Sequence, residues 1–330
     1  MNVRRHHISA AALAAVTALG LGSLTACSSD SAAAGNTDKF DVVASFYPMA
    51  FLAEQIGGEH ARVTSLTQPG QEPHDLEISA KQTAQLQESD AALYLKGLQP
   101  SVDEAIGQSG VATKIDAATL TSLEEHGAEA GHEDEHGDEH GHEDEHAEEE
   151  HGHEHEGGQD PHVWLDPVKY AEVAEGVGRA FEKADPDHAA DYRKNTEALV
   201  GKLNDLDASF EAGLKDRKTD VFVTTHSAFG YLAERYGLTE EAINGLDPES
   251  EPSGARVKEL SRTAKADGVT TVFYETLVSD RTAKTLADDA GLRTDVLDPL
   301  EGITDESRGD DYFQVMEANL EALQKALGAK

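Results

Sequence analysis

The chain has 330 residues, which suggests about two domains, and its formal net charge is −37. Lys and Arg total 27 against 64 Asp and Glu, so the clustered cations that bind nucleic acid are not expected. Hydrophobic residues make up 38%, enough for two modest cores, and the single Cys excludes an intramolecular disulfide.

Residues 1–26 have the features of a secretory signal. Two arginines precede an apolar run that is too short to span a bilayer comfortably. The end of this segment, Leu24-Thr25-Ala26-Cys27, resembles the bacterial lipobox, which implies cleavage before Cys27 and lipidation of its thiol. Residues 27–38 would then form a flexible tether. We therefore expect an extracytoplasmic protein, lipid-anchored to the bacterial cell membrane. The alternative is an ordinary secretory signal with a chance Cys nearby.

The N-terminal lobe is expected over residues 39–184. Short apolar runs predict strands at Asp41–Ser45, Arg62–Leu66, Ala91–Leu95 and Val111–Ile115. Helical spacing is present over Pro48–Ile56 and Ala80–Glu88. Because short strands alternate with helices, the sequence predicts α/β layers with parallel sheets.

Residues 124–158 form a low-complexity insertion in this lobe. The stretch 124–156 holds 16 acidic residues and no Lys or Arg. It also holds nine histidines: His126, His132, His136, His140, His142, His146, His151, His153 and His155. Such a composition lacks the apolar surface needed to offset chain entropy, so a disordered loop is predicted. Its imidazoles and carboxylates suggest weak metal gathering, and the alternative is a solvated linker.

A long helical region follows the insertion. Pro167–Ala184 predicts one helix, and Asp185-Pro186-Asp187 ends it and starts the next. The helical pattern then continues from His188 to about Leu214, which corresponds to roughly 40 Å at 1.5 Å per residue. A helix of this length can join two lobes. We assign residues 185–216 to this rigid linking helix.

The C-terminal lobe is expected over residues 217–330. Strands are predicted at Val221–Thr225, Thr270–Tyr274 and Arg293–Leu297. Helices are predicted at Arg256–Ala266, Asp280–Ala290 and Tyr312–Leu327. The alternation again indicates an α/β lobe with a parallel sheet.

Five histidines lie outside the signal and the acidic insertion. His60 falls in a polar turn and His188 at a helix start, so both are expected on the surface. His74 lies in a turn-rich loop after a strand, His162 lies between two Asp-Pro pairs, and His226 directly follows an apolar strand. Open α/β sheets present their ligands in loops at the carboxyl ends of strands. Each of these three could also be a structural histidine.

Asp298 follows a predicted strand in the same way as His226. Three imidazoles and one carboxylate form a tetrahedral zinc set, which makes His74, His162, His226 and Asp298 candidate metal ligands. The alternative for Asp298 is a cap of the turn before Pro299. Imidazole also suits zinc better than manganese, which favours oxygen ligands.

Glu275 ends another predicted strand. It is placed to orient a ligand imidazole or to carry a water molecule. The alternative is a hydrogen-bonding role away from the metal. The fourth ligand therefore stays open between Asp298, Glu275 and water.

Several motifs together resemble the solute-binding lipoproteins of bacterial zinc and manganese ABC importers. The matching segments are Ser45–Pro48, Gly70–Glu77, Asp160–Pro167, Thr225–Tyr231, Glu251–Ser253, Tyr274–Ser279 and Asp298–Leu300. The resemblance implies two α/β lobes joined by one long helix, with the metal in the cleft between them. It places His74, His162, His226 and Asp298 at the ligand positions of the family. Manganese members tend to have Glu where this chain has His226.

The resemblance predicts a monomeric protein that captures Zn²⁺ and delivers it to a membrane permease, and not an enzyme. Manganese is the alternative cargo. A zinc metalloenzyme would also suit three histidines. However, the His-Glu-x-x-His segments of this chain, His132–His136 and His142–His146, lie in the low-complexity insertion and on no predicted helix, and Glu275 would be the only base near the three histidines. A storage or adhesion lipoprotein is less favoured, because storage does not need one shaped site between two lobes.

Overall fold

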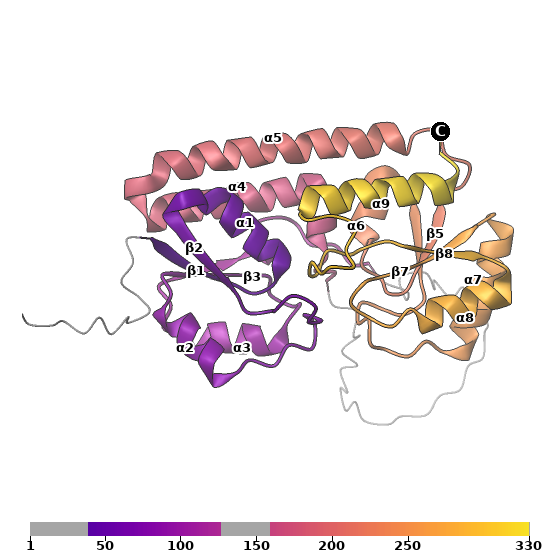
Figure 1. Cartoon of the computed structure of the whole chain (residues 1–330), viewed down its shortest axis with the longest axis horizontal. Helices are drawn as coiled ribbons and strands as arrows, with labels where there is room; N and C mark the ends of the chain where they lie inside the picture. Colours follow the sequence, from indigo (N-terminus) through magenta and orange to yellow (C-terminus); the bar gives the residue numbers. More distant parts are fainter. Residues whose placement is uncertain (1–38, 127–158, 330) are drawn as a thin grey trace, which may run out of the picture. The chain divides into compact units, whose positions relative to one another are not determined.

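The computed structural model describes residues 39–126 and 159–329 (Figure 1). The predicted signal, Cys27 and the tether lie outside the described residues, and so does every loop histidine after His126. Among the helices that are described, none is long and apolar enough to cross a membrane.

The first sheet is parallel, with the strand order β2-β1-β3-β4. Its strands are β1 (Phe40–Ala44), β2 (Ala61–Ser65), β3 (Ala91–Tyr94) and β4 (Thr113–Asp116). The helices of this lobe are α1 (Tyr47–Gly57), α2 (Ala80–Glu88) and α3 (Pro100–Gln108). Alternate residues of β1 face opposite layers: Val42 packs in the core that contains α1, whereas Val43 packs with Leu86 of α2 and Val102 of α3. Helices therefore cover both faces of the sheet, as a parallel sheet requires.

The second sheet repeats this plan, with the parallel order β6-β5-β7-β8. Its strands are β5 (Val221–Thr224), β6 (Thr239–Ala242), β7 (Thr271–Tyr274) and β8 (Arg293–Val296). The helices around it are α6 (Gly230–Tyr236), α7 (Gly254–Ala266), α8 (Arg281–Ala290) and α9 (Tyr312–Leu327). Phe222 of β5 packs in the core that contains α6 and α9, whereas Val223 packs with Leu260 of α7 and Leu286 of α8.

Two long helices connect the sheets, α4 (Pro167–Ala184) and α5 (Ala189–Gly213), and they run side by side (Figure 1). The Asp166 side chain starts α4 by accepting hydrogen bonds from two backbone N–H groups, and Pro167 occupies the first turn. Helix α5 has 25 residues, which span roughly 38 Å, and it packs against α1 and α9 as well as α4. The two parallel α/β sheets and the long helix confirm the predicted fold class.

One large core runs through both lobes along the segment before α4. Trp164 is fully buried there and donates a hydrogen bond from Nε1 to the Pro299 carbonyl, at 2.7 Å. Tyr312 of α9 donates from its hydroxyl to the Trp164 carbonyl, at 2.6 Å. Because this core is continuous, the domain limits expected at residues 184 and 216 stay a prediction.

Candidate metal centre

Four side chains from distant parts of the chain meet at one point: His74, His162, His226 and Glu301. Their potential ligand atoms all lie within 4.8 Å of one another. Oε1 of Glu301 lies 3.1 Å from Nε2 of His74, 3.3 Å from Nε2 of His162 and 3.5 Å from Nε2 of His226. Three imidazoles therefore direct the same ring nitrogen at one carboxylate oxygen.

The topology explains this meeting point. His226 lies two residues after the end of β5, Glu301 lies in the loop after β8, and His74 lies in the loop between β2 and α2. His162 comes from the segment that precedes α4. The carboxyl ends of the parallel strands in both sheets thus supply three of the four side chains, as expected for open α/β sheets.

Two more carboxylates contact the Nδ1 atoms of two of these imidazoles, on the side of each ring opposite to Glu301. Oδ1 of Asp160 lies 2.7 Å from Nδ1 of His162, and Oε1 of Glu275 lies 2.9 Å from Nδ1 of His226. The Thr225 hydroxyl donates to the same Glu275 oxygen, at 2.5 Å. A carboxylate on Nδ1 fixes the ring orientation and leaves Nε2 for a metal. Glu275 therefore contacts an imidazole and is not itself one of the four.

Charge and burial also suit a cation at this point. Burial lowers the pKa of His162, but Asp160 and Glu301 outweigh it and raise the value to about 9. Burial likewise lowers the pKa of His226, and Glu275 with Glu301 raises it well above the usual range. Burial raises the pKa of Glu301, but the three imidazoles hold it well below its ordinary value. A bound divalent cation would take over the positive charge that the imidazolium groups otherwise supply.

Unpartnered polar atoms support the same interpretation. Nε2 of His162, Nε2 of His226 and Oε2 of Glu301 are buried and make no hydrogen bond of acceptable geometry with the described residues. Buried polar atoms normally have a partner, so such atoms need an explanation. A metal ion bound by these groups would provide one, because three imidazoles and a carboxylate form a zinc-type donor set.

Asp298 does not belong to this group of four. Its Oδ1 accepts a hydrogen bond from the Leu300 backbone N–H at 2.8 Å, and its Oδ2 accepts one from the Thr276 hydroxyl at 3.2 Å. Glu301, three residues later in the same loop, lies beside the imidazoles instead. The sequence marks Asp298 because it follows a strand, whereas Glu301 follows an irregular turn. The only signal for Glu301 is that it is another carboxylate in the same loop.

His126, the first histidine of the acidic insertion, has fixed partners. Its Nδ1 lies 2.9 Å from Oδ2 of Asp160, and its Nε2 lies 3.2 Å from Oε2 of Glu234. The Asp160 backbone N–H donates to the Glu124 carbonyl at 2.9 Å. We call Glu124, His126 and Asp160 the neck of the insertion. The neck brings both ends of the insertion together, two residues before His162.

The other two described histidines lie together, away from the four. The rings of His60 and His188 stack with their centroids 4.1 Å apart and their planes inclined by 21°. Each ring also meets an aspartate, Asp191 for His60 at 3.0 Å and Asp185 for His188 at 2.7 Å. Both side chains are partly exposed. The sequence places each of them at the surface but contains no sign that they pair.

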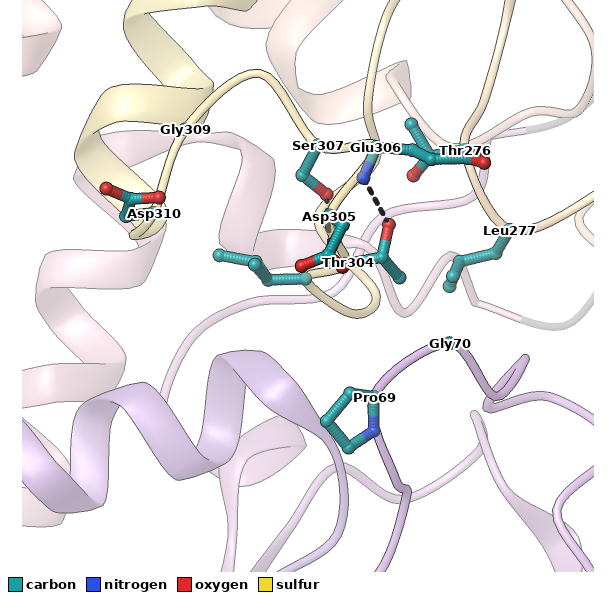
Figure 2. Close-up of a pocket in the computed structure, with 11 residues that line it drawn as sticks. Pro69, Gly70, Thr276, Leu277, Thr304, Asp305, Glu306, Ser307, Gly309 and Asp310 are labelled. Atoms are coloured by element: carbon teal, nitrogen blue, oxygen red, sulfur yellow. Dashed lines mark hydrogen bonds between the residues drawn. The ribbon is translucent and has the colours of Figure 1, made fainter.

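A pocket of about 760 Å³ is lined by the loops that carry His74 and Glu301, together with Thr276 and Leu277 of the loop after β7 (Figure 2). Figure 2 shows Pro69 and Gly70 on one side and the loop that holds Thr304 and Ser307 on the other. The Thr304 hydroxyl accepts a hydrogen bond from the Glu306 backbone N–H at 3.1 Å, which stabilises this loop. Of the four clustered side chains, only His74 has appreciable exposure, at 13%.

Comparisons with known proteins agree with this geometry. A family model described as "Zinc-uptake complex component A periplasmic" matches residues 42–326. The chain is 37% identical over 308 residues to the zinc-binding lipoprotein AdcA of Streptococcus pneumoniae, which covers 92% of this chain and 58% of AdcA. It is 36% identical over 327 residues to the high-affinity zinc uptake system protein ZnuA of Bacillus subtilis, covering 94% of this chain and 98% of that protein.

A solved structure gives the same result. The crystal structure of the Zn(II)-bound ZnuA-like domain of S. pneumoniae AdcA aligns with a TM-score of 0.69 and 34% identity, covering 88% of this chain and 99% of that one. The chain spans a little over half the length of the streptococcal full-length relatives. The matched family is that of an uptake component, and no catalytic family is indicated.

Proposed function

Because the chain belongs to the family of periplasmic zinc-uptake components, we propose that it captures Zn²⁺ outside the cytoplasm and delivers it to the permease of an ABC importer. The observation that carries this proposal is the cluster of His74, His162, His226 and Glu301, of which all but His74 are buried. The ion is the cargo of this protein, and the four side chains are its proposed ligands.

The donor set favours zinc over manganese. Three imidazole nitrogens and one carboxylate oxygen match a tetrahedral zinc site, whereas manganese prefers mainly oxygen ligands. His226 supports this choice because it places a nitrogen at the position where the manganese relatives tend to have Glu. Manganese remains the alternative cargo, and direct competition between the two ions distinguishes them.

Membrane attachment through Cys27 is the second part of the proposal. Leu24-Thr25-Ala26-Cys27 supports it, and so does the name of the streptococcal relative as a lipoprotein. Lipid attachment would keep the protein, as a monomer, close to its permease. We expect Cys27→Ala to move the protein from the membrane fraction to the soluble extracytoplasmic fraction. A variant that stays with the membrane would rule out this anchor.

The acidic insertion is proposed to gather zinc with lower affinity than the cluster. Its nine histidines and 16 acidic residues offer many ligands close together, which raises the local concentration of bound ions. The neck supports this role because it places both ends of the insertion beside Asp160, which contacts His162. If deletion of residues 127–156 changes neither the number of zinc ions bound per protein nor growth under zinc limitation, the insertion is only a linker.

Competitive metal titration tests the central proposal. The chain from Asp38 onward is titrated with Zn²⁺ against a chelator and against Mn²⁺, with and without residues 127–156. One tight zinc site should survive the deletion and disappear in His226→Ala, while His60→Ala serves as a matched histidine control. The proposal fails if tight binding is lost with the insertion, or if Mn²⁺ displaces Zn²⁺ from the cluster.

A further inference from the structure

The turn that carries Glu301 has an unusual backbone. After β8 ends at Val296, the chain enters an irregular segment in which Leu300 has a φ of 59°. No other non-glycine residue in the described ranges has a positive φ. A residue with a β-carbon is disfavoured in this left-handed region. Other contacts must therefore hold the turn in this conformation.

Asp298 supplies the first of these contacts. Its Oδ1 accepts the hydrogen bond from the Leu300 backbone N–H at 2.8 Å, so its side chain closes the turn two residues ahead. Its Oδ2 accepts from Thr276 in the loop after β7. Both carboxylate oxygens thus have protein partners, and the side chain is only 2% exposed.

The backbone of the turn is also clamped from two directions. The Asp298 N–H donates to Oδ1 of Asn319 at 2.9 Å, and Nδ2 of Asn319 donates to the Asp298 carbonyl at 2.7 Å. Trp164 Nε1 donates to the carbonyl of Pro299, the next residue. Asn319 lies on α9 and is 2% exposed, so this clamp connects the turn to the core.

We propose that Asp298 is a positioning residue, which holds the left-handed turn at Leu300 and thereby aims the Glu301 carboxylate at the three imidazoles. This inference rests on the proposed zinc-binding function and on Glu301 as a ligand. Asp298 would then affect zinc binding by fixing the backbone of the turn that carries Glu301, without contacting the ion itself. Asn319 supports the same role from α9.

Conservative substitution separates this role from direct ligation. Asp298→Asn keeps an oxygen that can accept the Leu300 N–H and gains an amide that can donate to Thr276. It removes the carboxylate, and zinc in proteins is bound by carboxylate, imidazole and thiolate groups. Asp298→Ala removes the turn contact as well. Glu301→Gln serves as the matched loss of the proposed ligand.

The test measures Zn²⁺ affinity by chelator competition, together with the visible absorption spectrum of the Co²⁺-loaded protein. We expect Asp298→Asn to bind zinc within about threefold of the parent with the parent's Co²⁺ spectrum. Asp298→Ala should lose roughly 10–100-fold, the range seen when a contact behind a ligand is removed, and its spectrum should approach that of Glu301→Gln. If Asp298→Ala does not fold, Asn319→Ala replaces it, with the same expected change in the spectrum.

Two results would overturn the inference. A loss in Asp298→Asn as large as in Glu301→Gln would make Asp298 a direct ligand. If a folded Asp298→Ala variant keeps the zinc affinity and the Co²⁺ spectrum of the parent, the turn does not need the Asp298 side chain to keep its conformation. If the proposed zinc-binding function is itself wrong, the result is different. The parent protein would then bind no zinc tightly, and His226→Ala would not change its zinc affinity.

Discussion

Asp160 shows how one side chain can serve two parts of the molecule. One of its carboxylate oxygens contacts Nδ1 of the proposed ligand His162, and the other contacts His126 at the neck. Asp160 is fully buried, and although burial raises the pKa of its carboxyl, the contacts with His162 and His126 lower it overall. The negative charge of Asp160 is therefore stable where it supports the ligand imidazole.

Asp160→Asn should weaken zinc binding by roughly 10–100-fold, because it removes the negative charge that orients His162 and makes it a better ligand. Chelator competition measures the change. Glu234→Gln is the matched control, because Glu234 contacts the opposite side of His126 and does not reach His162. Equal zinc affinities for Asp160→Asn and the parent would contradict this role.

The stacked pair of His60 and His188 gives a prediction about pH. The hydrogen bond and charge of Asp185 raise the pKa of His188. A histidine whose pKa is raised on folding contributes stability that is fully present below its unfolded value of about 6.5, and this contribution is lost as the pH rises through the folded value. His188→Gln should therefore lower the Tm more at about pH 5.5 than at about pH 9.

The difference between parent and variant is measured at each pH, so that effects elsewhere in the molecule cancel. Arg179→Gln is the control, since its exposed ion pair with Glu175 contains no histidine. The assignment is wrong if the loss of Tm in His188→Gln is the same at both pH values or grows with pH.

At the level of whole elements, α6 is tied to the start of α4 by one ion pair. Arg235 on α6 donates to both carboxylate oxygens of Asp166, at 2.9 Å and 3.1 Å from Nε and at 2.7 Å from its terminal nitrogen. Asp166 is 1% exposed and also caps α4 through the backbone N–H groups of the first turn. This pair links the segment that carries His162 to α6.

Arg235→Ala should lower the free energy of unfolding by about 1–3 kcal/mol, because it leaves the buried Asp166 without its cationic partner. Urea unfolding of the EDTA-treated protein measures the change. Arg179→Ala is a suitable comparison, since an exposed pair contributes about 0–1 kcal/mol. Similar values for the two variants would show that the Arg235 pair does not stabilise the junction.

Most elements could be predicted from the sequence because the central strands are apolar. The run at Val221–Thr225 predicts β5 to within one residue, and the helix at Ala80–Glu88 has the predicted limits. Strand β6 has the sequence TEEA, with no apolar run, because it is an edge strand that pairs only with β5. The sequence does not predict helix α6 either, since its seven residues are too few to show a helical period.

The candidate metal site could also be predicted only in part from the sequence. The positions of His74, His162 and His226 relative to strands and Asp-Pro pairs are visible in the sequence, and the structure brings these three together. Glu301 could not be found in this way, because its position depends on the left-handed turn at Leu300 and on contacts with Asn319, which lies in a helix further along the chain. Such tertiary contacts leave no local pattern.

At the scale of the whole molecule, two sheets with the same strand order share one continuous core and one group of proposed ligands. His74 comes from the loop after β2 of the first sheet, whereas His226 and Glu301 follow strands of the second. A metal ion bound by all of them would connect both sheets. Its binding energy should therefore stabilise the folded protein as one unit.

Zinc should raise the Tm of the protein in a single transition, and EDTA should reverse the shift. At a free zinc concentration of 100 times the Kd, the expected stabilisation is about 2.7 kcal/mol. Calorimetry with and without zinc measures it, and His226→Ala should show no comparable shift. Two separate transitions, only one of them sensitive to zinc, would contradict the view that the ion joins both sheets.

The uneven exposure of the four proposed ligands has a consequence for how fast an ion can leave. His162, His226 and Glu301 are each 1% exposed or less, whereas His74 is 13% exposed and lies in a loop without helix or strand. Among these four described side chains, His74 is thus the one that solvent and competing chelators would reach first on the way to a bound ion. We expect the residence time of the ion to depend on how often that loop moves aside, so a chelator in excess should extract zinc at a rate independent of chelator concentration. A permease that displaces this one loop would shorten the residence time without unfolding either lobe.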